Sequence, residues 1–113
     1  MKELNRKYVL HIPIHKFENN QVTRIKMDEL IEELTNRLYD NNYTSFYMTN
    51  VTGHYKNRAF DEILITIFTS KEQNQILPDT IFKQWFKENN NTLKQESFAF
   101  EYNNSLYIME ADE

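Results

Sequence analysis

Histidine supplies the first residues in this sequence whose spacing could do chemistry. His11 and His15 lie four residues apart in the stretch VLHIPIHKF, residues 9–17. Histidine titrates near neutral pH and is a common metal ligand, and on a helix this spacing would let both rings reach one ion. The alternation of apolar residues around them indicates a strand instead, along which they are about 13 Å apart. They therefore need partners from other strands.

Aromatic and acidic side chains of later segments are the available partners. Tyr47, His54 and Tyr55 belong to YTSFYMTNVTGHY, residues 43–55, and Glu101 lies near the end of the chain. The candidate ligand-binding residues are therefore His11, His15, Tyr47, His54, Tyr55 and Glu101. No residue stands out as catalytic, and we predict neither a metal site nor a cofactor. The plainest interpretation is that the histidines are ordinary, partly exposed positions on a polar sheet face.

Composition excludes several other chemistries. The chain has 113 residues, no cysteine, one glycine and a formal charge of −4. Thiolate nucleophiles, zinc–thiolate sites and disulfides need cysteine, and a phosphate-binding loop needs several glycines. The negative charge disfavours nucleic acid as a partner. Asp61, Glu62 and the other carboxylates are interpreted as solvated charges. No apolar run has membrane-spanning length and no signal peptide is evident, so we predict a cytoplasmic protein without a membrane partner.

Two periodicities alternate along the chain. The apolar residues recur every second position in some segments, which is typical of strands, and every three or four positions in others, which is typical of helices. Strands are predicted at 7–15, at 43–55 with 61–70 as a hairpin, at 95–102 and, after an Asn103-Asn104 turn, at 105–109; helices are predicted at 27–38 and from Pro78 to the Asn89–Asn91 run; loops are predicted at 16–25 and 71–77.

Two residues predict local irregularities in these strands. Pro13 cannot donate to a ladder, so the first strand should lie at an edge there or pair through other residues on that side. Gly53 is the single glycine and lies inside a strand pattern, which predicts a bulge that bends the second strand near its tip.

The order β, α, β, β, α, β predicts one domain, residues 1–113, with frayed ends at 1–6 and 110–113. It is typical of a ferredoxin-like α+β sandwich, an antiparallel sheet with two helices on one face, here with a short extra C-terminal strand. In this arrangement Leu10, Ile12 and Ile14 face the helices. His11 and His15 then line the open face, together with Tyr47 and Tyr55.

Residues 43–102 also show a resemblance to a known group. Gly53 followed by Tyr55 in the hairpin, and Gln95-Glu96-Ser97 before the last strand, resemble a family of small uncharacterised ferredoxin-like bacterial proteins. That family has no established activity, so the resemblance implies a fold and a small stand-alone domain, with no catalytic residue.

Two classes of function follow. The favoured interpretation is a non-enzymatic binding or accessory protein that forms a homodimer through its sheet, with a protein or small ligand as a further partner. The alternative is a small ferredoxin-like enzyme or ligand-binding protein with a His- and Tyr-lined pocket over the open face. A third interpretation, an inhibitor encoded by a phage or mobile element, fits only the size and the acidity. The sequence does not decide whether the chain is an enzyme.

Overall fold

A computed structural model describes residues 1–70 and 76–112 of the chain. The elements in chain order are β1 (Arg6–Pro13), β2 (His15–Glu18), β3 (Gln21–Arg24), α1 (Asp28–Asp40), β4 (Phe46–Tyr55), β5 (Arg58–Thr69), α2 (Pro78–Leu93), β6 (Ser97–Tyr102) and β7 (Ser105–Glu110). Most of the loop predicted at 71–77 lies outside the described residues.

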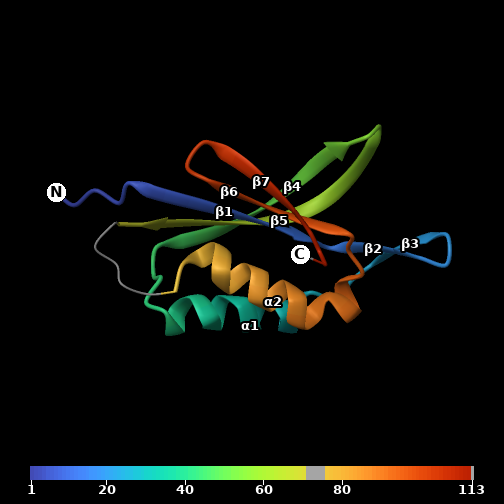
Figure 1. Cartoon of the computed structure of the whole chain (residues 1–113), viewed down its shortest axis with the longest axis horizontal. Coiled ribbons are helices and arrows are strands. Elements are labelled where there is room, and N and C mark those ends of the chain that lie inside the picture. Colours follow the sequence, from blue (N-terminus) through green and yellow to red (C-terminus); the bar gives the residue numbers. More distant parts are fainter. Residues whose placement is uncertain (71–75, 113) are drawn as a thin grey trace.

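Five of the strands form one antiparallel sheet in the order β4-β5-β1-β6-β7. Helices α1 and α2 lie side by side against one face of it (Figure 1). This confirms an α+β architecture with an antiparallel sheet covered on one side by two helices. The register sets the two faces, because residues directly opposite each other in neighbouring strands point to the same side.

The helix-covered face carries the core. Leu10 and Ile12 of β1 and Ile65 and Ile67 of β5 are fully buried there. From the helices, Leu34, Leu38, Phe82, Trp85 and Phe86 fill the space against them. Burying each such large apolar side chain contributes about 1.5–3 kcal/mol. The face assignment predicted for Leu10, Ile12 and Ile14 agrees with this packing, since all three are buried.

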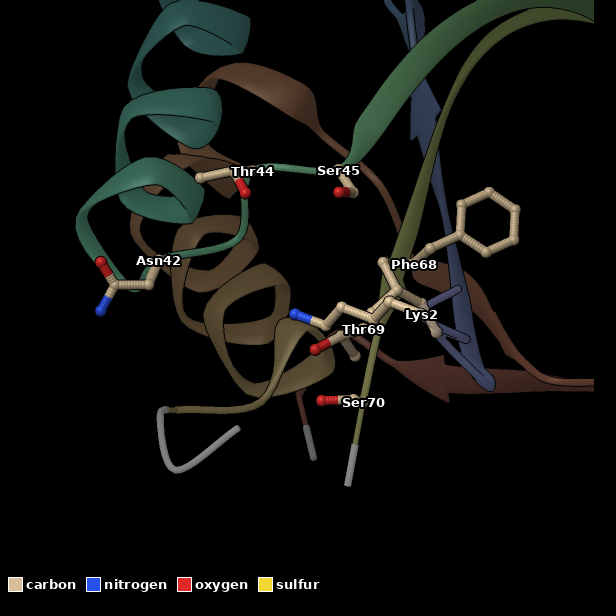
Figure 2. A pocket seen from close by; sticks show the side chains of 8 residues that line it. Lys2, Asn42, Thr44, Ser45, Phe68, Thr69 and Ser70 are labelled. Atoms are coloured by element: carbon tan, nitrogen blue, oxygen red, sulfur yellow. The ribbon is translucent and has the colours of Figure 1, made fainter. Parts of the chain in front are cut away.

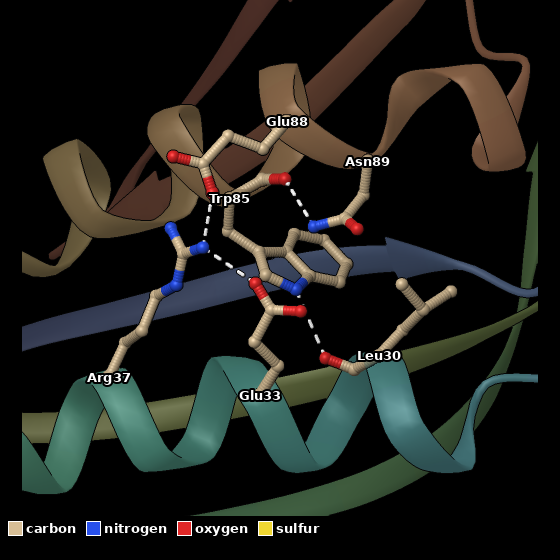
Figure 3. A network of polar contacts seen from close by, with 6 residues as sticks. All are labelled: Leu30, Glu33, Arg37, Trp85, Glu88 and Asn89. Atoms are coloured by element: carbon tan, nitrogen blue, oxygen red, sulfur yellow. Dashed lines mark hydrogen bonds and ion pairs between the residues drawn. The ribbon is translucent and has the colours of Figure 1, made fainter.

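A polar cluster joins the two helices on their outer side. The indole Nε1 of Trp85 donates to the backbone carbonyl of Leu30 at 3.0 Å. Beside it, Arg37 of α1 donates to Glu33 of the same helix at 2.6 Å and to Glu88 of α2 (Figure 3). The hydrogen bond of Nε1 therefore satisfies the one polar atom of the buried Trp85 side chain. The ion pairs of Arg37 beside it connect α1 to α2.

Residues 16–25 differ from their prediction. They were expected to be a loop, yet β2 and β3 pair over them as a two-stranded hairpin, with Phe17 opposite Val22. Its two turn residues, Asn19 and Asn20, both have positive φ, at 54° and 63°. This is the conformation of a tight hairpin turn that asparagine tolerates. The hairpin projects beyond the main sheet at the end away from the N-terminus (Figure 1).

The first strand also ends earlier than predicted. It stops at Pro13, and His15 belongs to β2 in the second sheet. The strand is central, between β5 and β6, although its pairing with β6 extends only from Tyr8 to His11. Pro13 therefore lies past the paired stretch on that side, which is where a residue without an N–H fits.

None of the described helices is both long and apolar enough to cross a membrane.

Candidate functional site

The face of the sheet that the helices leave open carries an unusual group of three charged side chains. His11 projects from the central strand, and the register places residues of β5 and β6 on either side of it. Its Nδ1 lies 3.3 Å from Oε2 of Glu62 on β5, and its Nε2 lies 2.6 Å from Oε2 of Glu101 on β6. We call Glu62, His11 and Glu101 the open-face cluster.

The two carboxylates favour the protonated ring. A neutral imidazole has one N–H to donate, whereas the imidazolium has two and satisfies both neighbours at once. Burial works against the charge and alone would lower the pKa of His11, but the contacts with Glu62 and Glu101 outweigh it, so the pKa is raised above its ordinary value. With all three groups charged, the open-face cluster carries a net charge of about −1.

Apolar residues surround the cluster. The register places Leu64 and Ala99 beside His11, Val51 beside Glu62, and Val9 and Leu106 beside Glu101. The side chain of His11 is 23% exposed, and those of Glu62 and Glu101 are 30% and 36% exposed. Charges in such partly dry surroundings interact more strongly than charges in open water. The cluster is therefore a group of charges surrounded by apolar side chains.

The structure brings two of the six predicted site residues together, His11 and Glu101. Tyr47 lies on the same face beside Phe68, with the ring centroids 6.4 Å apart, and is half exposed. Tyr55 shares this face but lies at the tip of the β4–β5 hairpin, where it pairs with Arg58.

The other two histidines lie elsewhere. For His15 this corrects the expectation that it lines the open face, and His54, a candidate partner, does not point to that face. His54 pairs with Ala59, and the alternation along β4 points its side chain to the opposite side from Tyr55. His15 lies in the β2–β3 hairpin, where its backbone carbonyl accepts a hydrogen bond from the side chain of Gln95 at 2.8 Å.

Glu62 is the residue that sequence reasoning missed. It was interpreted as a solvated charge next to Asp61. The signal was the alternation along β5, where the buried residues Ile65 and Ile67 and the partly buried Ile63 place Glu62 on the same face as Leu64. Its approach to His11 depends on the register between β1 and β5, which the alternation does not set.

Two cavities lie away from the cluster. One, of about 320 Å³, is lined mostly by polar side chains, including those of Lys2, Ser45, Thr69 and Ser70 (Figure 2). The other, of about 610 Å³, is a more apolar groove between the β2–β3 hairpin and the tip of β4–β5, with Phe17 and Phe60 among its lining. Over residues 1–70 and 76–112, no group of three or more histidine and carboxylate side chains is arranged to hold a metal ion.

Two solved structures share the architecture of this chain, and both are of a phage SAM lyase. The structure in complex with S-methyl-5'-thioadenosine has a TM-score of 0.58 and 13% identity, and the match covers 99% of this chain and 96% of that one. The apo structure has a TM-score of 0.58 and 14% identity, with 100% and 97% covered. At this identity the likeness shows the fold. No family model and no curated protein matches the sequence.

This comparison contradicts the favoured interpretation of the sequence. A non-enzymatic binding or accessory protein was expected, but the solved structures that share the fold along nearly the whole chain are those of an enzyme. The comparison favours the alternative, a small enzyme or ligand-binding protein, over a non-enzymatic one.

Proposed function

We propose that this chain cleaves S-adenosylmethionine and releases S-methyl-5'-thioadenosine, with the open-face cluster as the polar centre of its active site. The observation that carries the proposal is the pair of carboxylates, Glu62 and Glu101, held on an apolar sheet face. The full-length likeness to a phage SAM lyase, seen with that thioether bound, supports the choice of substrate.

The charges of the cluster suit this substrate. S-adenosylmethionine is a sulfonium cation that also carries an ammonium group, and a surface with a net negative charge attracts it. Each carboxylate contacts His11 through Oε2. The other oxygen, Oε1, is thereby left to receive a cationic group of the substrate.

The reaction needs no co-reactant. The bond between the sulfonium sulfur and the four-carbon amino acid arm breaks, and its electron pair stays on sulfur, which leaves as the neutral thioether. The arm's own carboxylate oxygen forms the new bond to the released carbon and closes a lactone. Because the charges of sulfonium and carboxylate cancel as the reaction proceeds, apolar surroundings such as Leu64 and Leu106 lower the barrier relative to water.

The proposed site is open on one side in a single chain. Tyr47, Leu106 and Ile108 are each more than half exposed on this face, although they are apolar. Exposed apolar surface of this kind marks association. We infer that copies of the chain form a homo-oligomer, a dimer in its simplest form, through the open face and so enclose the cluster.

Light scattering on the purified chain checks this association. We expect a mass above that of one chain and a return to one chain in Ile108→Lys, which places a charge in the contact. A wild-type protein that is monomeric at assay concentration and still active would contradict it.

The strand order is also compatible with the ferredoxin-like description. Without β7 the strand order is β4-β5-β1-β6. Of the two strands that flank β1, β5 follows β4 through a hairpin and β6 follows helix α2. We propose that the fold is this sandwich, extended by the β7 strand and by the β2–β3 hairpin. We also propose that the chain resembles small bacterial proteins of this fold. A cytoplasmic location agrees with an intracellular substrate.

The test of the function is direct. The purified chain is incubated with S-adenosylmethionine, and S-methyl-5'-thioadenosine is measured by liquid chromatography against a protein-free control, since the substrate also decays unaided. We expect formation above that background, and a loss of about 100-fold in the Glu62→Gln/Glu101→Gln double variant, the magnitude typical of removing a preorganised charged group.

A matched control removes the same charge elsewhere. Glu33→Gln/Glu88→Gln takes two carboxylates from around Arg37 on the helix side, and we expect it to keep its activity. No product above background in the wild type, or equal rates in both double variants, would overturn the proposal.

A further inference from the structure

Gly53 is the chain's single glycine, and its backbone gives no reason for a glycine. Its φ is not in the positive range. It pairs with Phe60 in an unbroken register that runs from Phe46 to Tyr55, so the predicted bulge at this position is wrong. Glycine inside a strand is less favourable than a β-branched residue, which packs better on a pleated surface. Something other than the backbone accounts for the missing side chain.

That reason is the carboxylate of Glu62. A Cβ added at Gly53 would lie 3.2 Å from Oε1 and 3.3 Å from Cδ of Glu62. The carboxylate thus lies over the backbone of β4, in the space that a side chain at 53 would take. Its other oxygen, Oε2, is the atom 3.3 Å from Nδ1 of His11. One oxygen of the Glu62 carboxylate therefore lies next to Gly53, and the other contacts His11.

We propose that Gly53 is a positioning residue, which leaves room for the Glu62 carboxylate to lie over β4 and contact the ring of His11. This rests on the proposed function for its catalytic meaning, because the open-face cluster is the site of that function. Its physical content is independent of the substrate. A side chain at 53 displaces Glu62 and loosens one of the two contacts that raise the pKa of His11.

The electrostatic surroundings of His11 make this displacement measurable. The carboxylates that contact its ring are Glu62 from β5 and Glu101 from β6. By register, the other titratable groups on this face of the sheet are Lys7 on β1, Tyr47 and Tyr55 on β4, Arg58 on β5 and Glu110 on β7. Among the residues that the structure describes, none of these groups forms a hydrogen bond or ion pair with the ring, so a change at Gly53 reaches His11 through Glu62.

The experiment titrates the His11 ring by NMR in the full chain. Gly53→Val introduces a residue that strands favour and should lower the pKa of His11 toward its value in Glu62→Gln, and Gly53→Ala should lower it less. In the Glu62→Gln background, Gly53→Val should cause no further shift. Thr49→Val, on the same strand and face, is the matched control and should leave the His11 titration unchanged.

The outcomes separate this proposal from the proposed function. An unchanged His11 pKa in Gly53→Val, where Glu62→Gln lowers it, overturns the positioning role. So does a shift of equal size in the Glu62→Gln background, because it would not pass through the carboxylate. If the pKa falls as expected and no thioether is formed by the wild type, the positioning role stands and the lyase proposal fails. If the chain is active, the rate profile of Gly53→Val should move to lower pH by the same shift as His11.

Discussion

Two clusters in this molecule have the same plan, a cation held between two carboxylates, on opposite sides of the sheet. On the helix side Arg37 lies between Glu33 and Glu88 and ties α1 to α2. On the open side His11 lies between Glu62 and Glu101 and ties β1 to β5 and β6. The cation differs, and so do its surroundings. Arg37 lies between two packed helices, whereas His11 lies on an exposed, largely apolar sheet face.

Only one of the two cations can gain and lose its proton near neutral pH. The contact with Glu88 and, less strongly, that with Glu33 raise the pKa of Arg37 further above a value that is already out of reach, so its charge is permanent. The pKa of His11 is raised from a value near neutral, so its proton is stabilised and still removable. The permanent charge of Arg37 therefore serves to connect the two helices. The charge of the His11 cluster can change when a substrate binds.

The largest effect is expected when each cation is removed and thioether formation is measured. We expect His11→Gln to lower the rate by about 100-fold, because both carboxylates lose their orienting partner. Arg37→Met should keep the wild-type rate, since its cluster lies on the other side of the sheet. Equal effects of the two variants on the rate, at equal folded fraction, would remove the functional distinction between the clusters.

A smaller effect is expected on stability, and it differs between the clusters in its pH dependence. The folded pKa of His11 lies above that of the unfolded chain, about 6.5. Its stabilising contribution is therefore complete below about pH 6.5 and is lost as the pH rises through the folded pKa. The difference in free energy of unfolding between wild type and His11→Gln should shrink over that range.

The corresponding difference for Arg37→Met should stay constant between about pH 6 and pH 9 and amount to at most about 1 kcal/mol, since the pairs are partly exposed to solvent. Chemical denaturation at several pH values measures both differences. A pH-dependent cost for Arg37→Met, or a flat one for His11→Gln, would contradict the assignment of the removable proton to the open face.

Comparison of particular segments shows what could be read in advance. The spacing of Leu34 and Leu38, and of Ile81, Phe82 and Trp85, predicted two helices with one buried face each, and both helices are present. The hairpin at 16–25 was missed, although two asparagines between short polar strands form a tight turn readily. Most of β2 and β3 is exposed. Their sequences therefore carry few apolar residues and show no clear alternation of apolar and polar positions.

The face of the sheet to which each strand residue points could be predicted from the sequence. Alternation along a strand is a local property, and it placed His11 and Tyr47 opposite the core before any partner strand was known. Only the tertiary structure decided which open-face side chains meet. Glu62 reaches His11, and Gly53 makes room for Glu62, because β1, β4 and β5 pair in one register. Register arises from packing across distant segments, and a shift by one residue would send every side chain to the other face.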